Sequence, residues 1–203
     1  MKFTLGIKKN MSQIFNDEGR VCPVTVVTIG DLVVTQVKTK EVDGYDAVQV
    51  GFGERNAKNI SKPVLGHMKG GSYAYLKEFR LKEPSTLKVG DKVDLTTFKE
   101  GEEVQISSIS KGKGFQGVIK RHGFKGQPRS HGQKHSERAP GSISGGTRCG
   151  GRVPKGMRMA GRMGSDRITI KNLKLVGIDL EKKELLVEGA IPGRRGTLVE
   201  IRG

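Results

Sequence analysis

The chain has 203 residues, and its 37 lysines and arginines against 21 acidic residues give it a formal net charge of +16. A balance this basic favours a polyanionic partner, nucleic acid first and an anionic membrane surface second. The sequence contains no run of about 18 apolar residues, which excludes a membrane-spanning helix, and its two separated cysteines indicate no disulfide framework.

The first half of the chain alternates apolar and polar residues in short stretches that end at glycine turns. Residues 3–16 predict two short strands around a polar turn, and residues 21–29 predict a strand covered on both faces. Residues 32–38 and 48–52 continue the alternation on either side of an Asp-Gly turn. A meander of antiparallel strands is the natural interpretation.

Residues 54–72 interrupt this rhythm, and Pro63 with Gly70-Gly71 predicts a short helical insertion there. Strands resume at 73–81 and continue to residue 110. After residue 165 more strands follow, with a hairpin around the polar turn at 181–184.

The fold class that these patterns predict is mainly β. We expect a closed antiparallel β-barrel body, formed by residues 1–110 and 166–203, with the small helical insertion near 54–72. Residues 111–165 are expected to form a long basic, glycine-rich internal extension loop. The two halves of the body complete one barrel in this prediction, because neither half has enough strands to close alone.

The segment 111–164 differs from the rest of the chain in composition. It contains thirteen lysines and arginines, a single acid (Glu137), fourteen of the thirty glycines and three of the four histidines. Such a segment cannot bury enough apolar surface to offset its ordering entropy, so a polyanion is expected to order it. A loop of about 40 residues that goes out and back spans up to roughly 65 Å, which suits deep insertion.

We predict that this segment binds RNA. It has only two aromatic residues, Phe115 and Phe124, which favours contacts with folded, helical RNA over stacking along a single strand. The candidate RNA-binding residues are its cations and histidines: Lys111, Lys113, Lys120, Arg121, His122, Lys125, Arg129, His131, Lys134, His135, Arg138, Arg148, Arg152, Lys155, Arg158 and Arg162.

Other hypotheses for the same segment fit less well. GKGFQG at 112–117 matches a dinucleotide-binding fingerprint, but no βαβ unit surrounds it, and a phosphate of RNA or a flexible hinge is the better interpretation. Three histidines could form a zinc site with Cys149, yet two tight ligand pairs are lacking. GSISG at 141–145 fails the nucleophile-elbow pattern. We therefore predict no enzyme activity, no cofactor and no metal.

Three methionines, Met157, Met159 and Met163, lie near the end of the segment, on the arm that returns to the barrel. The favoured interpretation is a small apolar patch that docks this arm onto the barrel. Packing against nucleobases is the alternative.

Several blocks of the sequence resemble the bacterial-type large-subunit ribosomal protein L3 family. They include GIKKNMSQIFNDEGRVCPVTVV at 6–27, KPVLGH at 62–67, GKGFQGVIKRHGF at 112–124, HGQKHSERAPGSI at 131–143 and KGMRMAGRMG at 155–164. The resemblance implies a β-barrel body on the ribosome, an extension that enters large-subunit rRNA toward the peptidyl-transferase centre, and a role in early subunit assembly. It also implies rRNA and neighbouring large-subunit ribosomal proteins as partners, no membrane, no small-molecule substrate and a cytoplasmic location.

The resemblance places the tip of the extension near the peptidyl-transferase centre. The tip residues are Ser144, Gly145, Gly146, Thr147, Arg148, Cys149, Gly150, Gly151 and Arg152. Many bacterial members carry a methylated glutamine near this point, whereas this tip has no glutamine, so we do not predict that modification.

The sequence is also compatible with one alternative function. A free nucleic-acid-binding regulatory protein built on a small β-barrel would share the basic charge. The absence of a recognition helix and of an aromatic platform counts against it.

Overall fold

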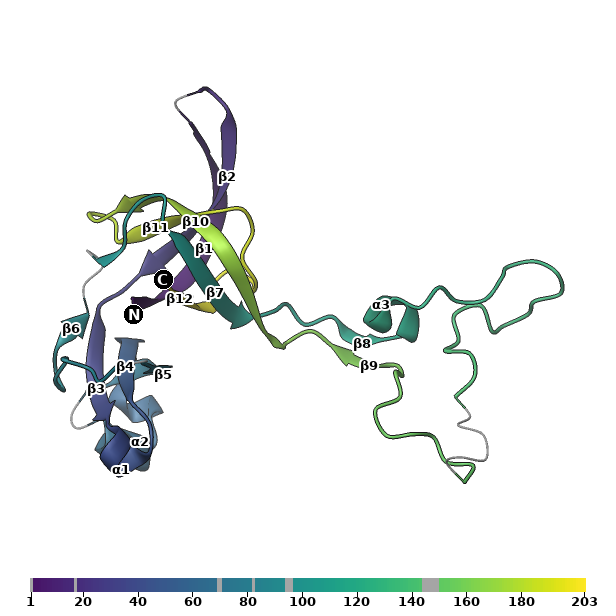
Figure 1. The fold of residues 1–203 in the computed structure, drawn as a ribbon, viewed down its shortest axis with the longest axis horizontal. Helices are drawn as coiled ribbons and strands as arrows, with labels where there is room; N and C mark the ends of the chain where they lie inside the picture. Colours follow the sequence, from purple (N-terminus) through teal and green to yellow (C-terminus); the bar gives the residue numbers. More distant parts are fainter. Residues whose placement is uncertain (1, 17, 69–70, 82, 94–96, 144–149) are drawn as a thin grey trace. The chain divides into compact units, whose positions relative to one another are not determined.

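The computed structural model describes residues 2–16, 18–68, 71–81, 83–93, 97–143 and 150–203. The chain divides into two compact units (Figure 1). We call Met1–Ile109 together with Arg167–Gly203 the body, and Ser110–Asp166 the basic unit. The predicted mainly β fold class is confirmed, since strands dominate the described residues and the helices are few and short.

Six strands of the body pair around a closed ring in the order β1-β12-β7-β10-β11-β2, and β2 pairs back to β1. Every pairing in the ring is antiparallel. Three of these strands precede the basic unit in the sequence and three follow it. The strands are β1 (Phe3–Phe15), β2 (Val21–Ile29), β7 (Glu103–Ile109), β10 (Arg167–Asp179), β11 (Glu184–Glu188) and β12 (Leu198–Arg202).

A second, four-stranded sheet of the body lies outside this ring, in the order β5-β4-β3-β6. The sequence pattern predicted that these residues belong to the barrel. Alternation predicted their strands, but strand partners depend on contacts far apart in the sequence. The elements are β3 (Leu32–Lys38), α1 (Lys40–Asp43), β4 (Ala47–Glu54), the 3₁₀ turn η1 (Ala57–Asn59), α2 (Lys62–His67), β5 (Tyr73–Arg80) and β6 (Lys92–Val93). The elements η1 and α2 form the predicted helical insertion, and a proline lies in the first turn of α2.

Two apolar clusters stabilise the body. One is built from the ring strands and contains Ile106, Leu175 and Ile201, each fully buried. The other joins β1 to the second sheet, because Phe3 and Leu5 pack with residues of β3, β4 and β5. Strand β1 therefore contributes to both the ring and the second core, and it ties the two sheets of the body together.

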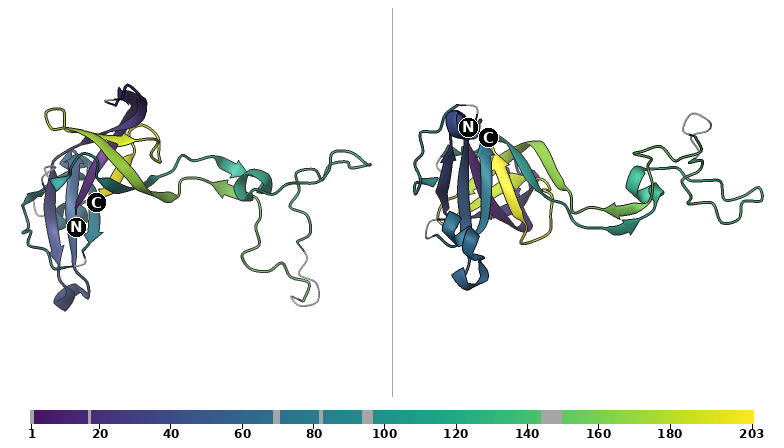
Figure 2. Two further views of the ribbon diagram at one scale, coloured as in Figure 1. Left: turned by 45° about the horizontal axis from the view of Figure 1, so that its top comes forward. Right: turned by 90° about the horizontal axis from the view of Figure 1, so that it is seen from below.

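Strand β1 corrects the sequence analysis at residues 3–16. The structure has one strand of thirteen residues rather than two strands around a turn. The pairing with β2 shifts between Lys8 and Met11, which is a β-bulge that absorbs the polar residues and lets the strand continue. Its far end is exposed, with Phe15 63% accessible. At the other end Phe3 pairs with Arg202, so the two chain ends lie side by side (Figure 2).

The predicted hairpin around residues 181–184 is confirmed, because β10 ends at Asp179 and pairs antiparallel with β11 from Glu184. In the basic unit the elements are short: β8 (Gly114–Gln116), α3 (Val118–His122) and β9 (Gly161–Met163). No helix in the described part of the chain is long and apolar enough to cross a bilayer.

Candidate nucleic-acid interface

A two-stranded ladder joins the outgoing and returning arms of the basic unit. Strands β8 and β9 pair antiparallel, with Gly114 opposite Met163 and Gln116 opposite Gly161. Two further backbone bonds extend the connection toward the ends of the unit: Lys113 N–H donates to the Met163 carbonyl at 2.9 Å, and Ser110 N–H donates to the Asp166 carbonyl at 2.9 Å. The two arms are therefore paired before the chain becomes irregular.

Gly164 completes this junction, and only glycine fits there. Its φ is +78°, in the left-handed region, and an added Cβ would lie 2.2 Å from the carbonyl oxygen of Lys111. The returning arm can approach the outgoing arm this closely because residue 164 has no side chain.

Helix α3 contacts the returning arm through two of the predicted RNA-binding residues. Arg121 Nη1 donates to the Met159 carbonyl at 2.7 Å, and a ring nitrogen of His122 lies 3.0 Å from the same oxygen. Gly161 gives the Arg121 guanidinium room, since a Cβ there would lie 2.7 Å from Nη1. Both side chains are half-buried. They hold the basic unit together, and their contact with RNA stays a prediction.

A backbone contact closes a loop in the middle of the unit. Gln127 N–H donates to the Glu137 carbonyl at 2.9 Å. Gly126 has a φ of +82°, and a Cβ added to it would lie 2.6 Å from the same carbonyl oxygen. The loop between them presents Arg129, His131 and Lys134 to solvent. Loop closure thus brings several candidate cations into one exposed segment.

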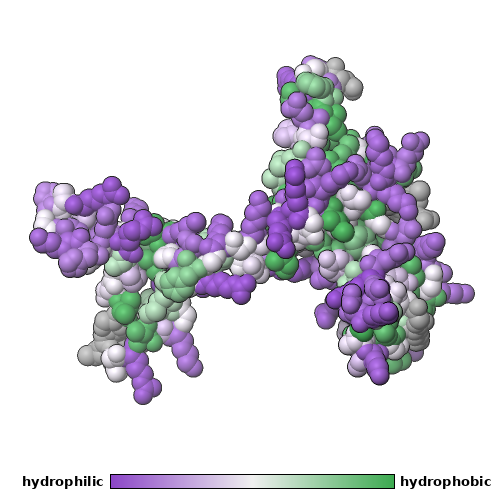
Figure 3. Space-filling model, turned by 180° about the vertical axis from the view of Figure 1, so that it is seen from behind, coloured by the Kyte–Doolittle hydropathy of each residue, from purple (hydrophilic) through white to green (hydrophobic). Residues whose placement is uncertain are grey.

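Most candidate cations lie at the surface without a neutralising partner. Among described residues of 111–164, the one ion pair joins Arg129 to Glu137. Figure 3 shows hydrophilic residues over much of the visible surface of the basic unit. A protein surface usually mixes both signs of charge, so this excess of unpaired positive charge creates a field that attracts a polyanion. The exposed candidates are Lys111, Lys113, Lys120, Lys125, Arg129, His131, Lys134, His135, Arg138, Arg152, Lys155, Arg158 and Arg162.

Part of the predicted tip lies outside the described residues. This applies to Ser144–Cys149, including Arg148 and Cys149. The described tip residues Gly150, Gly151 and Arg152 are exposed, and both glycines have positive φ. The proposed role of the tip stays a prediction.

The structure also bears on the other hypotheses. The glycine-rich stretch 112–117 contains strand β8, which pairs antiparallel with β9, so it lacks the parallel βαβ unit that a dinucleotide site needs. Among the described residues, no group of three or more histidine, cysteine or acidic side chains could hold a metal ion. Met159 and Met163 are half-buried within the basic unit, and their docking on the barrel stays a prediction.

Comparisons with known proteins decide the family. The family model described as ribosomal protein L3 matches residues 68–186. A large ribosomal subunit protein uL3 of Herpetosiphon aurantiacus is 49% identical over 97% of this chain and 93% of its own length. Proteins of the same description from Roseiflexus sp. and Finegoldia magna are 50% and 44% identical, over 98% and 100% of this chain and 95% and 97% of their own lengths.

The chain belongs to the ribosomal protein L3 family. The resemblance noted from the sequence blocks is thereby confirmed. Members are ribosomal structural proteins, so the chain is not an enzyme, as predicted. Members of this family take part in translation as components of a ribonucleoprotein. The family acts in cytoplasmic ribosomes.

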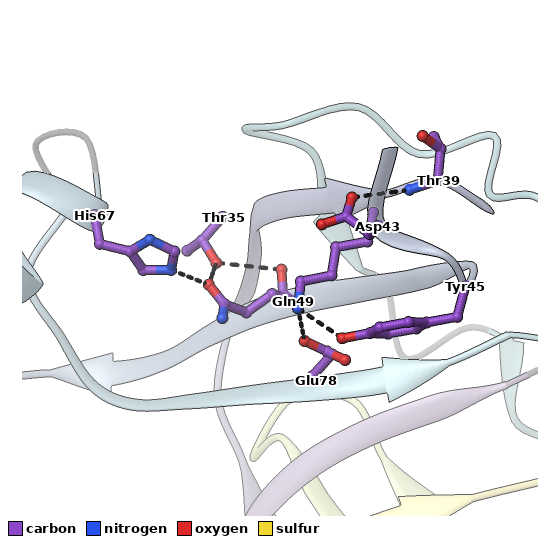
Figure 4. A network of polar contacts seen from close by, with 8 residues as sticks. Thr35, Thr39, Asp43, Tyr45, Gln49, His67 and Glu78 are labelled. Atoms are coloured by element: carbon purple, nitrogen blue, oxygen red, sulfur yellow. Dashed lines mark hydrogen bonds and ion pairs between the residues drawn. The ribbon is translucent and has the colours of Figure 1, made fainter. Parts of the chain in front are cut away.

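A polar network that the sequence pattern does not predict lies on the second sheet of the body (Figure 4). A ring nitrogen of His67 lies 2.8 Å from Gln49 Oε1, and Thr35 Oγ1 donates to that oxygen at 2.9 Å. His67 thus supports α2 against β4.

Lys38 forms the second half of this network. Its Nζ lies 2.7 Å from a carboxylate oxygen of Glu78 and donates to Tyr45 Oη at 2.7 Å. The hydrogen bonds with Glu78 and Tyr45 raise the pKa of Lys38, and the same Lys38 bond lowers the pKa of Glu78. No local pattern links residues 38, 45 and 78. Lys38 lies on β3 and Glu78 on β5, the two strands that flank β4, and Tyr45 lies just before β4, so they meet only in the folded sheet.

Proposed function

We propose that this protein is a structural constituent of the large ribosomal subunit, where it binds large-subunit rRNA mainly through the basic unit. The single observation that carries this proposal is the exposed, unpaired positive charge of the basic unit, in a chain that belongs to the ribosomal protein L3 family. Relatives from several organisms are described as large ribosomal subunit proteins.

The proposed mechanism contains no chemical step. Lysines and arginines neutralise phosphates and release counterions, and glycines allow the backbone to approach RNA closely. The β8–β9 ladder and the contact of Arg121 with the Met159 carbonyl hold the two arms together at the base of the inserted segment. The remaining exposed candidates then face phosphates in the rRNA.

We further propose where the protein lies in the subunit and when it joins. The tip, residues 144–152, reaches toward the peptidyl-transferase centre. The protein joins the subunit early in assembly and contacts neighbouring large-subunit proteins. The family resemblance supports these statements, and the unusual composition of the segment is compatible with deep insertion.

The test is sedimentation of cell lysate through a magnesium-containing gradient. An integral component co-migrates with large subunits and stays with them at high salt. A free regulatory protein, the alternative function, dissociates under these conditions, and that result would contradict the proposal.

A charge-neutralised variant makes the test specific to the basic unit. Arg152→Gln, Lys155→Gln and Arg158→Gln together remove three exposed cations. The matched control, Lys40→Gln, Lys58→Gln and Lys62→Gln, removes three exposed cations from the body. We expect the first variant to bind rRNA with a salt dependence shallower by about 3 in slope, and the control to change little. Equal effects of the two variants would argue against the basic unit as the main interface.

A further inference from the structure

A second cationic site lies on the body, in a cleft that the sequence analysis did not identify. The cleft has a volume of about 380 Å³ and is open to solvent. Its lining consists of charged side chains from three strands, β5, β10 and β12: Lys77, Glu78, Arg80, Arg167, Glu200 and Arg202.

Strand alternation on β12 points two of these side chains into the cleft. Val199 and Ile201 are fully buried in the apolar cluster of the ring strands, so Glu200 and Arg202 project from the opposite face of the strand. Strand β5 is the edge strand of the second sheet, and it contributes the facing side chains. The cleft therefore exists only because the two sheets of the body meet here.

Glu200 sets the position of two of the cations. Its carboxylate is nearly buried, at 10% exposure, with one oxygen 3.1 Å from Lys77 Nζ and the other paired with Arg167. Burial acts to raise the pKa of Glu200, but the hydrogen bonds with Lys77 and Arg167 outweigh it, and the net pKa is lowered. Glu200 thus stays ionised and holds the two cations on either side of itself.

The two other arginines of the cleft lie over aromatic rings. The guanidinium of Arg80 lies 4.5 Å from the centre of the Tyr45 ring, and that of Arg202 lies 5.1 Å from the centre of the Phe79 ring. A guanidinium that lies over an aromatic ring keeps N–H donors at its edge, and such donors bind oxyanions. Among the described residues, neither arginine has an ion pair, and Arg202 Nε is a buried donor without an acceptor.

The charge balance of the cleft favours an anion. Four cations and two carboxylates line it, which gives a net charge of +2. One of the carboxylates, Glu78, already pairs with Lys38 outside the lining. The lining contains no apolar side chain, whereas a docked protein segment needs apolar anchors at its centre. A phosphate needs only charge and hydrogen-bond donors, so the lining suits RNA better than a protein partner.

We propose that this cleft binds one phosphate of an RNA backbone through Arg80 and Arg202, as a second RNA contact on the body. The proposal rests on the proposed function, because it takes RNA as the partner. It assigns to the body a defined phosphate site in addition to the contacts of the basic unit.

The test uses the full-length chain and large-subunit rRNA. The double variant Arg80→Gln with Arg202→Gln is compared with Lys171→Gln plus Lys174→Gln, which removes two exposed cations of β10 outside the cleft. We expect the cleft variant to lose about tenfold in affinity and about 1 in the slope of log affinity against log salt, and the control to lose much less. Arg80→Gln alone is included because Arg80 is exposed, so its replacement leaves folding intact even if the Arg202 change does not.

A second arm identifies the ligand. With the guanidinium N–H groups labelled for NMR, a titration with a short RNA oligonucleotide is expected to shift the Arg202 Nε–H signal. Inorganic phosphate alone should shift it only at much higher concentration. A shift produced equally well by inorganic phosphate would overturn the RNA assignment, as would a shift produced by an acidic peptide and not by RNA.

The outcomes separate the two proposals. If the basic-unit variant loses rRNA affinity and the cleft variant keeps it, the phosphate site is wrong and the proposed function stands. If the unaltered protein binds no rRNA, the proposed function itself fails.

Discussion

Arg121 and Met159 lie 38 residues apart in the sequence, and the guanidinium of the first donates to the carbonyl of the second at 2.7 Å. This contact fastens helix α3 to the returning arm just before β9. A cation that the sequence marks as an RNA ligand therefore has a partner within the protein. A substitution at Arg121 therefore tests how firmly the two arms are joined.

Replacing Arg121 with alanine should loosen this junction. A hydrogen bond from a charged group contributes about 1.5–3 kcal/mol, and the neighbouring His122 contact to the same oxygen compensates in part. We expect amide exchange in Gly161–Met163 to become about fivefold faster, which corresponds to about 1 kcal/mol. Lys120→Ala, an exposed change in the same helix, is the control. Equal exchange rates in the two variants would show that the contact contributes nothing in solution.

Replacing Gly164 with alanine should disrupt the base of the basic unit. The new Cβ would meet the Lys111 carbonyl at 2.2 Å, and the residue would keep a positive φ that alanine disfavours. We expect a local loss of at least about 1 kcal/mol, seen as lost amide protection in β8 and β9. Gly117→Ala serves as control, because that glycine has an ordinary φ of −69° and open space around it. Retained protection in the Gly164 variant would contradict the close approach of the two arms.

The second core of the body depends on Phe79. This ring is fully buried and stacks on Phe3, with centroids 4.4 Å apart. Phe79→Ala should lower the free energy of unfolding by about 3–5 kcal/mol, measured by urea denaturation. Phe15→Ala removes an exposed ring and should cost about 0.5 kcal/mol or less. A similar cost for both would mean that β5 does not pack on β1 as described.

Because of Glu200, the stability of the body should fall at acid pH. Its pKa is lower in the folded protein than the ordinary value of 4.5. The stabilisation is therefore complete above about pH 4.5 and is lost as the pH falls through the lowered folded pKa. Glu200→Gln should reduce stability at neutral pH and flatten its decline between about pH 5 and pH 3. The exposed Glu41→Gln is the control, and an unchanged slope in the Glu200 variant would refute the pairing with Lys77 and Arg167.

The sequence by itself determined the mainly β class and the separation of charge. Alternation at residues 32–38 and 48–52 is a local property, so it predicts strands without knowledge of their partners. The excess of thirteen cations over one acid in 111–164 is also readable directly, and it points to a polyanion. The family blocks are linear motifs, and the comparisons confirmed them.

Only the tertiary structure decided which strands pair and which cations are available. The bulge in β1 and the separation of β3–β6 from the ring depend on register between distant segments, which no local pattern specifies. Arg121 looks like Arg158 in the sequence, yet the first contacts the Met159 carbonyl and the second is exposed. The cleft of Arg80 and Arg202 joins residues more than a hundred positions apart. These residues come together through the packing of distant strands, which the chemistry of their side chains does not predict.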